Sequence, residues 1–125
     1  MTEWTNIIYD QHTKFTTPLP DEKFLSSLSK NIKVLDAGCG YGRVLRYLNG
    51  IGFKNLTGFD ISKNYIDETK RTCPKAKVFV SGFEDFEPKD KYGLILLMGV
   101  IEYISSDKKQ GIFFNKISRS LSSGG

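Results

Sequence analysis

The sequence contains few residues of the kinds that cross-link a chain, ligate metals or anchor it in a membrane. Its 125 residues include two cysteines and one histidine. Cys39 and Cys73 form neither a disulfide framework nor the spacing of a metal site. The longest apolar run, Leu94 to Met98, is far too short to cross a bilayer. We therefore expect no metal site and no membrane partner.

Strong charge is also missing. Eighteen Lys and Arg residues against fourteen Asp and Glu residues give a net charge of +4. No block of five or more like charges occurs, so a nucleic-acid partner is not indicated. The opening residues Met1 to Trp4 lack the basic and apolar regions of a signal peptide. Together with the low cysteine count, this predicts a cytoplasmic protein.

What the chain does contain is enough apolar material for a core. Hydrophobic residues make up 39% of the sequence and aromatic residues 13%. This composition argues against disorder. At this length we expect a single domain over residues 1–125.

Short apolar segments that suit β-strands alternate with segments of helical spacing. The predicted strands are Lys33 to Asp36, Leu56 to Phe59, Lys77 to Val80 and Tyr92 to Met98. The predicted helices begin near Trp4 and at Asp21, run from about Gly42 to Asn49, follow Ser62 as far as Pro74, and span Asp107 to Leu121. Alternating strands and helices predict an α/β fold with a parallel sheet, in which ligands bind beyond the carboxyl ends of the strands.

The first predicted strand runs into Asp36-Ala37-Gly38-Cys39-Gly40-Tyr41-Gly42. Glycines at alternate positions let the backbone turn through positive φ and let a ligand approach closely. The helix that follows offers backbone N–H groups to a polar ligand. Strand, glycine turn and helix form the first half of a nucleotide-binding βαβ unit, although a plain strand-to-helix turn is the alternative.

The second predicted strand also ends in an acid. Asp60 lies 18 residues after Gly42, close to the spacing at which a carboxylate accepts hydrogen bonds from a ribose diol. A helix-capping role beside Ser62 is the alternative. The position at a strand end favours the ribose interpretation.

The pattern Asp-x-Gly-x-Gly-x-Gly from Asp36 to Gly42 resembles motif I of the class I S-adenosylmethionine (SAM)-dependent methyltransferases. It lacks the G-x-G-x-x-G spacing of dinucleotide enzymes. The resemblance covers about residues 30–125 and implies SAM as the cofactor and a Rossmann-like parallel sheet with helices on both faces. The family's strand order is 3-2-1-4-5-7-6, and only the first four strands are found, so we expect a domain apparently truncated after strand four, in the order 3-2-1-4.

The resemblance also implies roles for individual residues. Asp36 would offset the positive charges of SAM, and Ile61 would lie against the adenine. Gly82 stands where the family commonly has an acid for the adenine amine, so Glu84, Asp85 or the backbone at Phe83 would substitute. The full implied cofactor-binding set is Asp36, Gly38, Cys39, Gly40, Asp60, Ile61, Gly82, Phe83, Glu84, Met98 and Gly99.

Methyl transfer needs a positioned acceptor more than a catalytic triad, and no catalytic residue is identified. The lead hypothesis is a SAM-dependent methyltransferase whose acceptor is unknown. A SAM-binding module without turnover is one alternative. An NAD-type oxidoreductase domain is another, which the glycine spacing disfavours. The apolar fourth strand would form an unpaired edge, so a homodimer through that edge is a further hypothesis.

Overall fold

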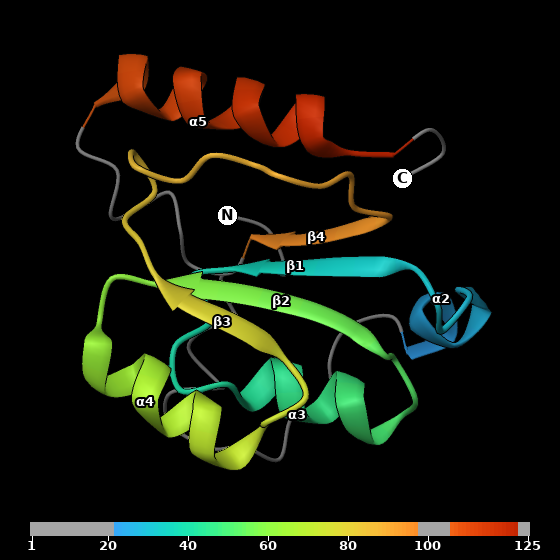
Figure 1. Ribbon diagram of the computed structural model, residues 1–125. Helices are drawn as coiled ribbons and strands as arrows, with labels where there is room; N and C mark the ends of the chain where they lie inside the picture. Colours follow the sequence, from blue (N-terminus) through green and yellow to red (C-terminus); the bar gives the residue numbers. More distant parts are fainter. Residues whose placement is uncertain (1–21, 98–105, 123–125) are drawn as a thin grey trace.

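The computed structural model describes residues 22–97 and 106–122, which form a parallel four-stranded sheet with helices on both faces (Figure 1). This confirms the predicted α/β, Rossmann-like fold. The elements in chain order are α2 (Glu22–Ser27), β1 (Lys33–Ala37), α3 (Arg43–Gly50), β2 (Asn55–Asp60), α4 (Lys63–Thr72), β3 (Lys77–Val80), β4 (Leu94–Leu97) and α5 (Asp107–Ser120).

The strands lie in the order β3-β2-β1-β4, as predicted. All neighbouring pairs are parallel; Leu35 of β1, for example, pairs with Thr57 of β2 and with Ile95 of β4. The strand arrows in Figure 1 therefore all point the same way, to the left. The predicted site residues that follow β1, β2 and β3 consequently lie at the same end of the sheet, beyond the carboxyl ends of the strands.

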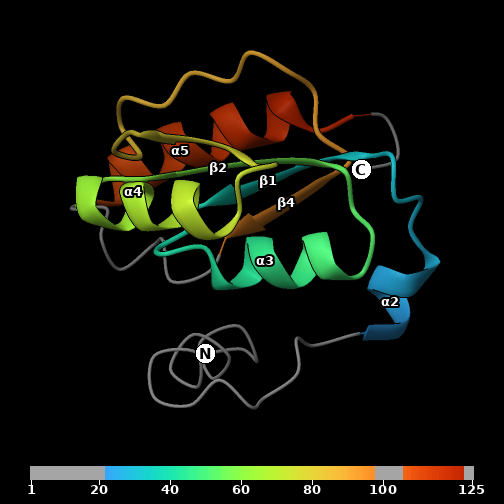
Figure 2. The ribbon, with the colours of Figure 1, turned by 60° about the horizontal axis from the view of Figure 1, so that its bottom comes forward.

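Helices α3 and α4 cover one face of the sheet and α5 covers the other (Figure 2). Because successive strand residues point to opposite faces, Val34 of β1 belongs to the hydrophobic cluster that includes Leu45 and Leu48 of α3. Leu35 belongs to a second cluster, which includes Phe113 of α5. From Val34 to Ala37, strand β1 is thus buried between two hydrophobic clusters.

The fourth strand is shorter than predicted. Leu94–Leu97 forms β4, and Tyr92 instead makes an isolated parallel bridge with Leu121. The Tyr92 N–H donates to the Ser120 carbonyl at 2.7 Å, and the Ser122 N–H donates to the Tyr92 carbonyl at 2.8 Å. The beginning of the predicted open edge is therefore already paired within the chain.

The two long helices begin at serine caps. Ser62 Oγ accepts from the Tyr65 N–H at 3.2 Å at the start of α4, as the sequence predicts, and Ser106 Oγ accepts from the Lys109 N–H at the start of α5. On α5, Phe113 is buried, whereas the neighbouring Phe114 is 37% exposed. None of the helices over residues 22–97 and 106–122 has the length and apolarity to cross a membrane.

Candidate functional site

The glycine loop after β1 has the backbone that the motif predicts. Gly38, Gly40 and Gly42 all adopt positive φ, of 79°, 57° and 89°. The N–H groups of Gly38 and Cys39 both donate to the Phe59 carbonyl, at 2.8 and 2.9 Å, which fastens the loop to the end of β2. Gly42 is the N-cap of α3, and no side chain caps this helix. The first turn of α3 therefore faces the loop without a capping side chain.

Two of these glycines have opposite surroundings. A Cβ added to Gly40 would meet no atom of residues 22–97 or 106–122 within 4 Å. A Cβ added to Gly42 would lie 2.7 Å from Thr69 Cγ2 of α4, closer than packed carbon atoms approach. Gly40 therefore borders open space among the described residues, and Gly42 is needed for packing.

Asp60, at the end of β2, binds backbone on both sides. Its Oδ2 accepts from the Gly40 N–H at 3.0 Å, and its Oδ1 accepts from the Ser62 N–H at 2.9 Å. The carboxylate thus joins the glycine loop to the start of α4. The bond to Gly40 places Asp60 beside the glycines, as predicted, and the bond to Ser62 places it at the start of the helix, as the alternative interpretation expects. Because a carboxylate has roughly four acceptor positions, these two bonds leave capacity for a diol.

Asp36 is the buried acid of the site. Its side chain is only 2% exposed, and no described residue donates a hydrogen bond to its carboxyl group. Burial raises the pKa of Asp36 to about 7, and the neighbouring negative charge of Asp60 adds to the rise. An uncompensated buried carboxyl group favours a cation beside it. A sulfonium or ammonium group would supply that compensation.

Cys39 fills space inside the loop. It is 7% exposed, and a Cβ on Gly58 of β2 would lie 3.0 Å from the Cys39 Cβ. Burial raises the pKa of the Cys39 thiol above its usual range, and the charges of Asp36 and Asp60 raise it further. Cys39 is thus a neutral packing residue rather than a nucleophile. It and Cys73 are both buried free thiols.

The segments after β2 and β3 bring together three predicted residues of the adenine side. Ile61 is 77% exposed. A Cβ on Gly82 would lie 3.8 Å from Ile61 Cδ1 and 3.6 Å from Asp85 Oδ2. Glu84 points elsewhere, since its carboxylate pairs with Lys109 Nζ of α5 at 3.2 Å. Of the two candidate acids, Asp85 is the one that lies beside Gly82.

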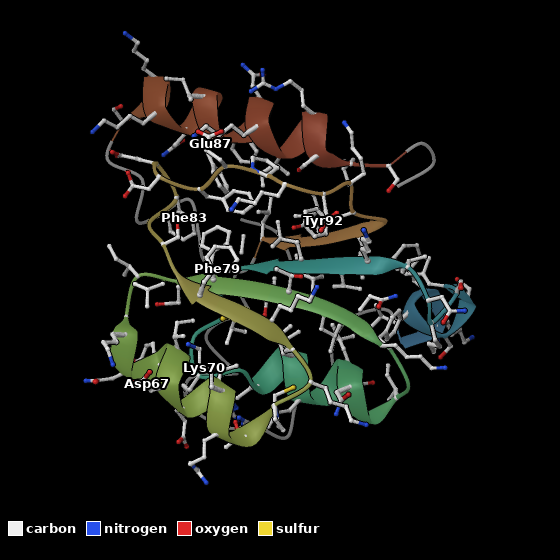
Figure 3. All side chains as sticks on the ribbon, in the orientation of Figure 1. Asp67, Lys70, Phe79, Phe83, Glu87 and Tyr92 are labelled. Atoms are coloured by element: carbon white, nitrogen blue, oxygen red, sulfur yellow. The ribbon has the colours of Figure 1, made fainter. Side chains whose placement is uncertain are left out.

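Phe83 lies on the α5 side of the sheet (Figure 3). Its ring packs edge-on against Phe59 of β2 and Phe113 of α5, with centroids 5.7 and 5.4 Å apart. These contacts make Phe83 part of the core, so a ligand would meet the backbone at this position more readily than the ring.

Lys116 of α5 holds the same loop and was not identified from the sequence. Its Nζ donates to the carbonyl oxygens of Glu84 and Phe86, at 3.1 and 3.0 Å, and pairs with Glu87 Oε1 at 2.9 Å. The side chain is only 12% exposed. The sequence indicates a partly buried Lys116 only through its position next to Ile117, which lies on the inward face of α5. Through Lys116 the loop after β3 is docked on α5.

Some predicted residues lie outside the described part of the chain. These are Met98 and Gly99 of the cofactor set. The described residues contain no group of three or more His, Cys, Asp and Glu side chains that could hold a metal ion.

Fold and site together define a class I methyltransferase architecture, and the comparisons with known proteins agree. A family model of methyltransferase domains matches residues 34–125. The chain belongs to this methyltransferase domain family. The predicted resemblance to the SAM-dependent methyltransferases is thereby confirmed at the level of the family.

Individual relatives are longer than this chain. A ubiquinone biosynthesis O-methyltransferase of Pelagibacter ubique is 32% identical over 100 residues, which cover 68% of this chain and 41% of the relative. Among solved structures, a TehB-like SAM-dependent methyltransferase from Corynebacterium glutamicum is 25% identical, with a TM-score of 0.73, over 98% of this chain and 65% of that one. A SAM-dependent methyltransferase from Thiobacillus denitrificans in complex with S-adenosylhomocysteine shares the fold, at 20% identity and a TM-score of 0.65, over 94% of this chain and 51% of that one. The chain thus spans less than half the length of the curated relative.

Proposed function

We propose that this domain binds SAM at the carboxyl edge of its sheet and transfers the methyl group to an acceptor. One observation carries the proposal: the buried Asp36 carboxyl group has no hydrogen-bond donor among the described residues and adjoins a glycine loop with open space at Gly40. SAM carries an ammonium and a sulfonium, and a carboxylate nearby offsets such charges when water is excluded. The family match and the relatives' names support the same cofactor.

We assign the remaining contacts by position. The free acceptor capacity of Asp60 suits the ribose diol, and the exposed Ile61 side chain suits an adenine face. Met98 and Gly99 remain candidates for the methionine ammonium on the resemblance alone. When bound, SAM supplies a methyl carbon already activated by its sulfonium leaving group. The protein's task is then to hold an acceptor atom in line with that carbon and to exclude water.

Calorimetric titration with SAM, S-adenosylhomocysteine and NAD tests the cofactor assignment. We expect both SAM compounds to bind and NAD not to bind, because the loop lacks the dinucleotide spacing. Binding of NAD alone would favour the oxidoreductase alternative. A methyl-transfer assay with labelled SAM, started with hydroxyl acceptors because the curated relative is an O-methyltransferase, separates an enzyme from a SAM-binding module without turnover.

We expect the Asp85 carboxylate to accept a hydrogen bond from the adenine amine, because Gly82 occupies the position where the family commonly has an acid. Asp85→Asn should weaken S-adenosylhomocysteine binding about three- to tenfold, because its carboxylate lies beside Gly82 and Ile61 and a charged acceptor strengthens the hydrogen bond. The matched variant Glu84→Gln loses only the exposed pair with Lys109 and should bind normally. Calorimetry measures both, and equal affinities for the two variants would contradict this role for Asp85.

Two further predictions concern the setting of the domain. We propose a reducing compartment such as the cytoplasm, supported by the two buried free thiols.

We also propose a homodimer through β4. Among the described residues, the outer edge of β4 has no neighbouring strand beyond the bridge at Tyr92, so it is available to pair with a second copy. Light scattering across a concentration series tests the dimer.

A further inference from the structure

The peptide groups around Gly40 are held by side chains at several points. The Gly40 N–H donates to Asp60 Oδ2 at 3.0 Å, and the Gly40 carbonyl accepts from Thr69 Oγ1 of α4 at 3.2 Å. The next carbonyl, of Tyr41, accepts from Arg46 Nη1 of α3 at 2.9 Å. Side chains from three separate segments therefore fix the orientation of the peptide groups that flank the open Gly40 position.

Thr69 is the most enclosed of these side chains. It is 0% exposed, and its methyl and hydroxyl occupy the place that a Cβ on Gly42 would need, at 2.7 and 2.9 Å. The missing side chain of Gly42 thus lets Thr69 reach across to Gly40. Gly42, the third glycine of the motif, therefore has a different role from Gly40. It makes room for a side chain of α4 and not for a ligand.

We propose that Thr69 is a positioning residue for the cofactor: its hydroxyl fixes the Gly40 carbonyl and so keeps the open face of Gly40 turned toward the cofactor. The inference rests on the proposed function of the glycine loop as the cofactor site. Thr69 itself contacts loop backbone and lies behind the loop, so it would act on binding through Gly40.

A purely structural role is the competing explanation. Thr69 Oγ1 also lies 2.9 Å from the Tyr65 carbonyl one turn earlier, the usual partner of a helical threonine. The hydroxyl group has one proton to donate, so the two carbonyl oxygens compete for it. If the bond within α4 alone matters, losing the hydroxyl affects α4 and leaves the loop and its ligand unaffected.

Thr69→Val tests the proposal, because it keeps the side-chain volume and removes only the hydroxyl. We expect S-adenosylhomocysteine binding to weaken about three- to tenfold, the range for one neutral hydrogen bond. Thr69→Ser restores the hydroxyl and should bind within about twofold of the original chain. Ser120→Ala is the matched control, since it removes another buried helical hydroxyl, one that donates to the Ile117 carbonyl in α5.

Amide hydrogen exchange at Gly40 supplies a readout that does not need the cofactor. Thr69→Val should speed exchange at this amide, because a released Gly40 carbonyl loosens the neighbouring bond to Asp60, while Ser120→Ala should not. Normal affinity and normal Gly40 exchange in Thr69→Val would overturn the proposal. If the original chain fails to bind S-adenosylhomocysteine, the proposed function is wrong, and the exchange rates alone decide whether Thr69 fixes the loop.

Discussion

Gly40→Ala is expected to weaken S-adenosylhomocysteine binding roughly 10- to 100-fold while the domain stays folded. The added Cβ meets no atom of the described part of the chain within 4 Å, and it would enter the space that we propose for the ligand. An extra methyl in a close contact typically costs about 1–3 kcal/mol. The positive φ of 57° adds backbone strain of about 1 kcal/mol, which lowers stability and not affinity. Calorimetry and thermal unfolding measure the two effects separately.

Two other glycines serve as matched controls for Gly40→Ala. Gly52→Ala also carries backbone strain, at a φ of 106° that is less accessible to alanine, but its Cβ would be in ordinary contact with Lys30 at 3.7 Å, at the opposite end of the sheet. We expect this variant to lose some stability and to keep its affinity. Gly42→Ala should lose more stability, about 1–3 kcal/mol beyond the strain, because its Cβ would overlap Thr69. Normal binding by Gly40→Ala would show that the open space is not ligand space.

Asp36→Asn is expected to raise the free energy of unfolding by about 2–4 kcal/mol at pH 8. Burial and then the charge of Asp60 raise the pKa of Asp36 from 3.8 to about 7, so at pH 8 the original chain must bury a carboxylate. Asparagine has nearly the same shape and no charge. The same variant should bind SAM less tightly, because the carboxylate that offsets the cofactor's positive charge is gone.

The raised pKa of Asp36 predicts how the stability difference between the two chains changes with pH. Between about pH 4 and 7 the folded chain holds a proton on Asp36 that the unfolded chain releases. Stability from this group is therefore fully present below the ordinary pKa of 3.8 and is lost as the pH rises to about 7. Urea unfolding across this range should show the two chains nearly equal at pH 4 and diverging above it. A constant difference at all pH values would mean that Asp36 does not titrate with a raised pKa.

Most of the fold was predictable because its signals are local. The apolar strands, the serine cap of α4 and the helical spacing of α5 each lie within a few residues of the structure that they specify. The strand order came from the family resemblance, since spacing alone does not order a sheet. The start of the fourth strand was misjudged because the apolar composition begins at Tyr92, whereas Tyr92 pairs with Leu121 and β4 begins at Leu94.

The parts of the candidate site that belong to a sequence motif were predictable. The parts formed by contacts between residues far apart in the sequence were not. Gly40 and Asp60 were both selected, but the hydrogen bond between them required the folded chain. Thr69 and Lys116 were missed because each acts on a loop far away in the sequence, and neither belongs to a motif. The choice between Glu84 and Asp85 depended on Lys109, which nothing in the local sequence indicates.

The central position of β1 has a consequence for how the domain opens. Val34 pairs with Leu56 on one side and with Leu94, much later in the chain, on the other, and both of its faces are covered by core. Amides in such a strand become accessible only in large-scale unfolding, whereas edge strands such as β3 fray in small local steps. The glycine loop continues directly from β1, so the proposed cofactor site is attached to the strand that we expect to unfold last.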